Sequence, residues 1–145
     1  MILLDTNVIS EGLRSRPDIN VRAWLDAQPA EDLFLCTPVL AELHYGAQLL
    51  PASVRRTKLE QSISELMVAF ADRILSFDAA AALEYGKFVA RRDRLGRATG
   101  SMDGLIAGVA LVHGAAIATR ATRATRGFDD AGLELIDPFN PSPPR

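Results

Sequence analysis

The sequence has little that would indicate a secreted or membrane protein. It contains one cysteine, Cys36, which excludes an intrachain disulfide and a zinc site built from cysteines. Cys36 follows an apolar run, so we expect a buried and unreactive thiol. No basic segment followed by a long apolar core stands near the first residue, so we expect neither a signal peptide nor a membrane span. These features favour a cytoplasmic protein.

The chain also has no excess of one charge. Its 16 basic and 18 acidic residues give a net charge of −2, which excludes the broad basic surface of a non-specific nucleic-acid binder. The arginines nevertheless cluster locally, over residues 91–97 and 120–126. The length of 145 residues and a hydrophobic content of 48% are those of a single globular domain.

Short apolar runs alternate with segments of helical periodicity. The predicted strands are 2–4, 33–36, 74–75, 115–118 and 133–136. The main predicted helices are 8–13, 37–50, 53–70, 78–95 and 101–113. This order predicts an α/β fold with a mostly parallel sheet of about five strands, covered by helices on both faces. We assign residues 1–138 to the domain and 139–145 to a proline-rich tail.

Three separated acidic residues fall at one edge of the predicted sheet. Asp5 directly follows the first strand, Glu42 lies early in the helix after the second, and Asp103 begins the helix before the fourth. Ligands of such sheets bind at the carboxyl ends of the strands. Carboxylates beside apolar residues are unfavourable unless something compensates, and Mg²⁺, which activates water, is one compensation. Each acid taken alone fits equally well as a helix cap or a solvated residue.

Polar neighbours fit the same site. Thr6 and Asn7 are expected to orient Asp5 or a bound water, and Ser101 to support the backbone near Asp103. Ordinary helix capping by these three residues is an alternative that does not exclude the first.

Other constellations of catalytic residues are missing from the sequence. It has no glycine-rich phosphate loop and no G-x-S-x-G elbow. A phosphate-accepting receiver-type domain also places carboxylates at strand ends, but it needs a lysine near a late strand, where this chain has only Arg120.

Several segments together resemble the PIN-domain proteins, especially the VapC and FitB-like toxins of type II toxin–antitoxin pairs. The opening Met-Ile-Leu-Leu-Asp-Thr-Asn of residues 1–7 is similar to their first motif, and Ala-Glu-Leu at 41–43 to their second. Ser-Met-Asp-Gly-Leu-Ile-Ala at 101–107 resembles the third, and residues 113–120 and 135–138 also match. The resemblance covers nearly the whole chain and implies a PIN-like three-layer α/β/α sandwich.

The resemblance implies an endoribonuclease that depends on Mg²⁺ or Mn²⁺ and halts translation. It gives metal-binding and catalytic roles to Asp5, Glu42 and Asp103. It also implies a homodimer that is inhibited by a small VapB-like antitoxin. Promoter DNA would be bound only indirectly, through that antitoxin.

One departure from the family concerns the fourth motif. After Thr-Arg the family usually has Asn or Asp, and then an acid before an aromatic residue. Here residues 118–126 are three Ala-Thr-Arg units, and Gly127 precedes Phe128. Asp129 or Asp130 is a candidate substitute for the missing acid.

The repeat leaves two questions open. Its arginines could contact RNA phosphates, or the segment could simply lengthen a surface loop. The arginines in question are Arg120, Arg123 and Arg126. The missing acid also leaves room for a second function, a catalytically weakened PIN domain that binds RNA or the antitoxin.

Overall fold

The computed structural model describes residues 1–122, 125 and 128–141, without the side chains of residues 129 and 130. A five-stranded sheet with the order β3-β2-β1-β4-β5 forms its centre, and every neighbouring pair is parallel. The strands are β1 (Ile2–Leu4), β2 (Leu33–Cys36), β3 (Ile74–Leu75), β4 (Ala116–Ala118) and β5 (Leu135–Ile136). The predicted α/β class and strand number are confirmed.

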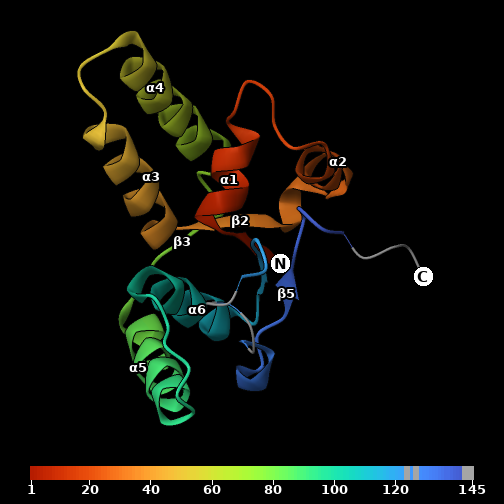
Figure 1. Cartoon of the computed structure of the whole chain (residues 1–145), viewed down its shortest axis with the longest axis vertical. Helices are drawn as coiled ribbons and strands as arrows, with labels where there is room; N and C mark the ends of the chain where they lie inside the picture. The colour runs from red at the N-terminus through yellow and green to blue at the C-terminus, as the bar shows by residue number, and fades with distance from the viewer. Residues whose placement is uncertain (123–124, 126–127, 142–145) are drawn as a thin grey trace.

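Six helices cover the sheet on both faces. They are α1 (Thr6–Gly12), α2 (Ile19–Ala27), α3 (Thr37–Leu49), α4 (Val54–Ala69), α5 (Ala79–Arg94) and α6 (Ser101–His113). Short 3₁₀ turns occupy η1 (Ala30–Asp32) and η2 (Phe128–Ala131). Helices α1 to α4 lie on one side of the sheet, and α5 and α6 on the other (Figure 1). This gives the predicted three layers.

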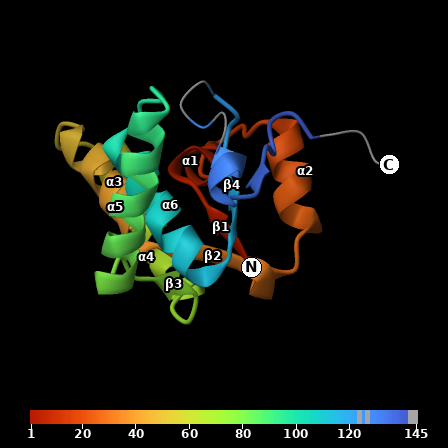
Figure 2. The same ribbon diagram turned by 90° about the horizontal axis from the view of Figure 1, so that it is seen from below.

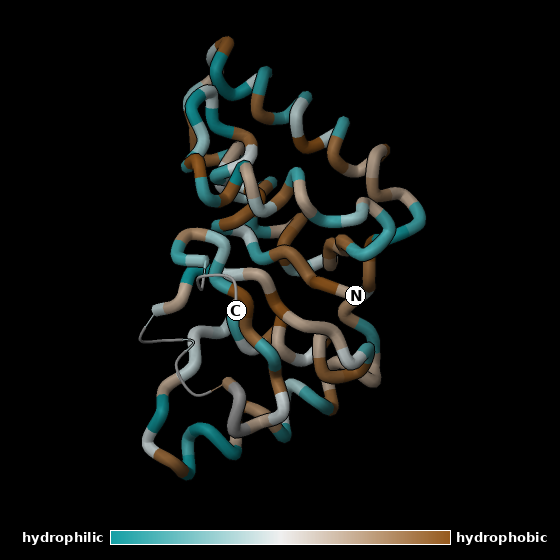
Figure 3. The backbone as a smooth tube through the Cα atoms, turned by 90° about the vertical axis from the view of Figure 1, so that its right-hand side faces the viewer, coloured by the Kyte–Doolittle hydropathy of each residue, from teal (hydrophilic) through white to brown (hydrophobic). Residues whose placement is uncertain are grey.

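The strands are continuous apolar runs, as expected for a parallel sheet whose two faces are both covered by helices. Leu3, Leu35 and Ile117 are buried at the centre of the sheet. The brown, hydrophobic part of the chain is concentrated in the middle of the molecule, and teal residues recur along the outer helices (Figure 3). In the part of the chain that the structure describes, no helix is both long and apolar enough to cross a membrane.

Helices α5 and α6 pack side by side along their length (Figure 2). Two glycines of α6 allow this contact. A Cβ added to Gly108 would stand 2.6 Å from the carbonyl oxygen of Ala81, and one added to Gly104 would stand 2.7 Å from the ring of Tyr85. The close approach fixes the position of the first turn of α6, which carries Asp103.

Several predicted boundaries were wrong at the ends of elements. Helix α1 begins at Thr6 rather than at residue 8, and its cap is Asp5, whose side chain accepts from the Thr6 N–H; Thr6 and Asn7 are therefore helical residues and not caps. Helix α6 is capped by Gly100, so Ser101 is its first residue and not its cap. Several residues near the start of each helix have side chains that can cap it, so the sequence alone does not define the first helical residue. The backbone conformation shows which residue is the cap.

The C-terminal segment packs on the domain beyond residue 138. Phe139 is buried, and its carbonyl oxygen accepts a hydrogen bond of 3.1 Å from the Asn20 side chain of α2. Phe139, predicted to belong to the tail, therefore contacts the folded domain. The proposed division into domain and tail otherwise stays a prediction.

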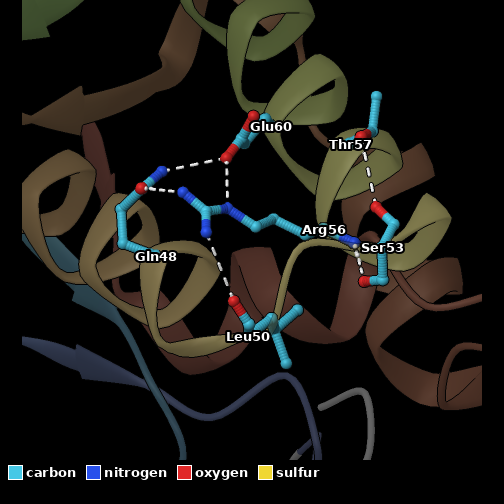
Figure 4. A network of polar contacts seen from close by, with 6 residues as sticks. All are labelled: Gln48, Leu50, Ser53, Arg56, Thr57 and Glu60. Atoms are coloured by element: carbon cyan, nitrogen blue, oxygen red, sulfur yellow. Dashed lines mark hydrogen bonds and ion pairs between the residues drawn. The ribbon is translucent and has the colours of Figure 1, made fainter.

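Helices α3 and α4 form a hairpin that projects from the body (Figure 1). Arg56 joins its two arms (Figure 4): Nε donates to Glu60 at 2.8 Å, one terminal nitrogen donates to the Gln48 side chain and the other to the Leu50 carbonyl at 3.4 Å. Gln48 also donates to Glu60 at 3.0 Å. The guanidinium thus ties the last turn of α3 to the first turns of α4.

Candidate active site

Asp5 lies at the carboxyl end of the central strand, where β1 meets its neighbours β2 and β4. Its backbone N–H continues the ladder to Ala118 at 3.0 Å, so its position is set by the sheet. The side chain is only 7% exposed. One carboxylate oxygen accepts from the Thr6 N–H at 2.7 Å and the other from the Asn7 amide at 3.1 Å. Thr6, through its backbone, and Asn7, through its side chain, therefore both donate to the Asp5 carboxylate.

Thr119 is a site residue that the sequence did not single out. It follows β4 as Asp5 follows β1, and it is 2% exposed. Its hydroxyl donates to Asp5 Oδ2 at 2.6 Å and accepts from Asn7 Nδ2 at 3.1 Å. Asp5, Asn7 and Thr119 thus form a closed triangle of hydrogen bonds. The sequence signal for Thr119 is a hydroxyl directly after an apolar strand, which it shares with Thr37.

Glu42 reaches the site from α3. The Thr6 hydroxyl donates to Glu42 Oε2 at 2.5 Å, across 36 positions of sequence. Thr6 therefore contacts Asp5 through its backbone and Glu42 through its side chain. The predicted orienting role of Thr6 has a defined geometry here, with Glu42 as the side-chain partner.

Asp103 faces Asp5 across a small cavity. Helix α6 leads into β4, so it runs opposite to the strands and its first turn lies at their carboxyl edge. The cavity measures about 10 Å³ and is lined by Asp5, Asp103, Ile106, Ile117, Thr119, Thr125 and Phe128. Such a volume holds about one water-sized particle.

The negative charges of the three carboxylates repel one another. Burial raises the pKa of Asp5, the hydrogen bonds from Thr119 and Thr6 lower it, and the charge of Glu42 raises it again, with a net rise. Burial also raises the pKa of Asp103, and the charges of Asp5 and Glu42 add to that rise. Arg92 acts in the opposite direction on Asp103. The predicted triad is thus close enough for mutual repulsion.

Of the other predicted site residues, the structure describes Ser101 and Arg120. Ser101 is exposed at the start of α6. Arg120 lies at the rim: its backbone N–H donates to Asn7 Oδ1 at 3.2 Å, and its guanidinium stands 3.9 Å from the centre of the Phe139 ring. Arg123, Arg126 and the side chains of Asp129 and Asp130 lie outside the described residues.

Thr125, from the third Ala-Thr-Arg unit, is buried and lines the cavity. Its hydroxyl accepts from the Thr122 N–H at 3.0 Å. The repeat therefore brings a neutral hydroxyl to the wall of the carboxylate cavity. Nothing local in the sequence distinguishes Thr125 from the equivalent threonines of the other two units.

The donor set suits a small, hard cation. Within the described ranges, no three acid, histidine or cysteine side chains converge closely enough to hold an ion directly. Asp5 and Asp103 nevertheless share a one-particle cavity, and carboxylate oxygen is the ligand that Mg²⁺ prefers. Mg²⁺ usually keeps several waters and takes only one or two protein carboxylates. Two carboxylates beside a one-particle cavity therefore fit a single divalent ion, whose remaining waters would lie outside that cavity.

A groove of about 950 Å³ opens beside Glu42, between α1, α3 and α4. Its walls include Leu13, which follows α1, Leu43 and Gly46 of α3, and Leu59 of α4. Cationic side chains also line it, namely Arg14, Arg55 and Lys58. Thr6 and Glu42 belong both to this groove and to the carboxylate site.

Comparison with known proteins agrees with this geometry. The PIN domain family model matches residues 2–127. The chain is 42% identical over 143 residues to VapC ribonuclease Y4jK of Sinorhizobium fredii, covering 98% of this chain and 100% of that protein. It is 44% identical over 144 residues to Toxin FitB of Neisseria gonorrhoeae, covering 97% and 99%. The solved structure of FitAB bound to the IR36 DNA fragment superposes with a TM-score of 0.90 at 35% identity and covers all of both chains.

Proposed function

Since this chain belongs to the PIN-domain family, and within it to the VapC and FitB toxins, we propose that it is the toxin of a type II toxin–antitoxin pair. Its activity would be that of a Mg²⁺-dependent endoribonuclease, with Mn²⁺ as a substitute, which cleaves RNA through a metal-activated water. The name of the Sinorhizobium relative, a VapC ribonuclease, supports the choice of substrate. Because cellular RNA is the proposed substrate, the enzyme would act in the cytoplasm.

The observation that carries the proposal is the cavity between Asp5 and Asp103, with Glu42 beside it. Repulsion among three carboxylates is unfavourable in a half-buried site, and a divalent cation removes it. Asp5 and Asp103 would hold the ion, and Glu42 would bind through its waters. The ion would supply a more acidic water and neutralise charge on the phosphodiester.

The chain's own residues prepare this site before any ion binds. Thr119 and Asn7 fix Asp5 Oδ2, and the Thr6 N–H fixes Asp5 Oδ1. The Thr6 hydroxyl holds Glu42 toward Asp5. Such hydrogen bonds orient the ligating carboxylates. Arg120, at the rim, is placed where it could contact an RNA phosphate.

We assign the antitoxin to the groove between α1, α3 and α4. The groove combines apolar walls with cations, which fits an amphipathic segment that carries acidic residues. A partner seated there would lie beside Glu42 and could block access to the site. The FitAB–DNA structure supports a two-component assembly in which DNA is bound by the complex. The toxin itself is proposed to be a homodimer, as the family implies.

RNA cleavage with added Mg²⁺ tests the proposal. We expect cleavage by the wild type, none after chelation of the metal, and a loss of at least about 100-fold in Asp5→Asn and Asp103→Asn. Asp72→Asn is a matched control, because Asp72 is an exposed aspartate in a surface turn. Equal cleavage by the wild type and both site variants would refute the assignment.

One observation favours a second function, a PIN domain that binds RNA or the antitoxin without cutting. The cavity wall offers the neutral Thr125, from the segment where the family usually has an acid. Expression in a bacterial host separates the two functions. A ribonuclease toxin should arrest growth, and Asp103→Asn should relieve the arrest; a pure binding module should leave growth unaffected in both forms.

A further inference from the structure

Arg92 is a buried cation that the mechanism above does not use. It lies in the last turns of α5 and is only 3% exposed, whereas its neighbours Arg91 and Arg94 are exposed. Burying a guanidinium is unfavourable by several kcal/mol unless other groups compensate. No buried side-chain polar atom among the described residues lacks a hydrogen-bond partner, so the burial of Arg92 is supported. The surrounding residues therefore hold the Arg92 guanidinium in a defined position.

The contacts of Arg92 connect three segments around the carboxylate cavity. Its Nε donates to the Thr99 hydroxyl at 2.7 Å. The guanidinium carbon stands 4.6 Å from the ring centre of Phe128 and 5.8 Å from that of Phe88. The two rings meet edge to face at 4.9 Å. Arg92 therefore fastens the end of α5 to the segment before α6 and to the turn that begins η2.

Both of these segments form the surroundings of Asp103. Thr99 precedes Asp103 by four residues, and the Gly100 carbonyl between them accepts from the Gly104 N–H at 2.9 Å, which opens α6. Phe128 lines the cavity together with Asp5 and Asp103. Because the guanidinium of Arg92 packs on the Phe128 ring, its positive charge lies behind the wall of the cavity that Asp5 and Asp103 share.

We propose that Arg92 is a positioning residue with a second role, the built-in counter-cation of the carboxylate site. The proposal rests on the proposed metal-dependent function. In the metal-free protein, Arg92 offsets part of the negative charge on the Asp103 side of the cavity and holds the segment that begins α6 in place. The same charge repels an incoming divalent ion, so Arg92 weakens metal binding while it keeps the site assembled.

This role predicts that metal affinity increases when Arg92 is replaced by an uncharged residue. Removing the charge of Arg92 should tighten metal binding, whereas a residue that is only structural should weaken it when removed. The test is calorimetric titration of Mn²⁺ into metal-free protein. In Arg92→Gln and Arg92→Met we expect the Mn²⁺ affinity to rise roughly three- to tenfold. Met can keep the contacts with both rings, so Arg92→Met provides a folded variant if Arg92→Gln is unstable.

Two further variants serve as controls. Arg92→Lys keeps a positive charge but loses the planar contact with Phe128; because charge sets the expected effect, it should bind Mn²⁺ within about twofold of the wild type. Arg91→Gln removes the same charge from an exposed position of the same helix turn, where solvent screens it, and should also stay within about twofold. The increase in Tm on adding Mn²⁺ should follow the same order, because tighter binding raises stability further.

The outcomes separate the two proposals. If the wild type binds Mn²⁺ and folded Arg92→Gln or Arg92→Met binds it equally or more weakly, the role of Arg92 is overturned and the metal function stands. If the wild type does not bind Mn²⁺, the proposed metal function fails and the role of Arg92 fails with it. Tighter binding in both charge-removing variants, with unchanged controls, supports the inference.

Discussion

The contact between α5 and α6 gives a prediction whose size follows from the structure. In Gly108→Ala the new Cβ would stand 2.6 Å from the Ala81 carbonyl oxygen. An ordinary carbon–oxygen contact is about 3.3 Å, so α5 would have to move by about 0.7 Å. The obstacle is backbone, which cannot turn aside as a side chain can. Gly108→Ala should therefore strain the interface that supports the first turn of α6.

Gly86→Ala is the matched control for this prediction. Gly86 lies in α5, and nothing stands within 4 Å of a Cβ added there. Both substitutions gain about 1 kcal/mol of helix propensity, so their difference isolates the steric clash. Overpacking of this kind lowers the free energy of unfolding by about 1–3 kcal/mol. For a chain of this length the Tm of Gly108→Ala should be lower than that of Gly86→Ala by about 2–12 °C.

Urea denaturation of metal-free protein, followed by circular dichroism, measures the difference in unfolding free energy. Gly86→Ala should exceed the wild type in stability, and Gly108→Ala should fall below Gly86→Ala. Equal stability of the two variants would refute the reasoning, because it would mean that α5 and α6 do not approach as closely as the structure shows.

Three other predictions concern the site and its surroundings. Thr119→Val removes the 2.6 Å donor to Asp5 and should lower the free energy of unfolding by about 1.5–3 kcal/mol, measured by urea denaturation; no loss would contradict the closed triangle. The pKa of Asp103 is raised in the folded state, so its contribution to stability is greatest below the ordinary value and decreases as pH rises through the folded pKa. Metal-free Asp103→Asn should therefore be more stable than the wild type at pH 7, and the gap should close toward acid pH in a series of Tm measurements. Burial raises the pKa of the Cys36 thiol to about 12, so a thiol reagent should react only after unfolding, and rapid labelling of native protein would contradict its burial.

The sequence predicted that the three carboxylates lie near one another, because simple topology determines their placement; their roles stay a prediction. Asp5 directly follows a wholly apolar strand, and the carboxyl ends of parallel strands meet at one edge. Asp103 required one further step: a helix that leads into a strand begins at that same edge. These arguments need only the order of elements, which the apolar runs and helix periodicity define.

Thr119 and Arg92 could not be found in this way, because their roles depend on contacts between distant segments. Thr37 also follows an apolar strand, but it accepts a hydrogen bond of 2.9 Å from the Phe77 N–H and does not reach Asp5. Arg92 belongs to a run of arginines that resembles a solvated helix end. Its burial depends on Phe128, 36 positions away, which closes over the end of α5.

The hydrogen bond between Thr6 and Glu42 has a consequence for how such a protein can change over time. Helix α4 packs mainly on α3, and Arg56 ties the two together, so the outer wall of the groove can vary without disturbing the sheet that holds Asp5. If the groove binds the antitoxin and the carboxylates cleave RNA, as proposed, partner preference and cleavage can change almost independently of each other. Thr6 and Glu42 are the exception, since they belong to both surfaces. Under the proposed function, a substitution at either residue would alter partner recognition and cleavage together.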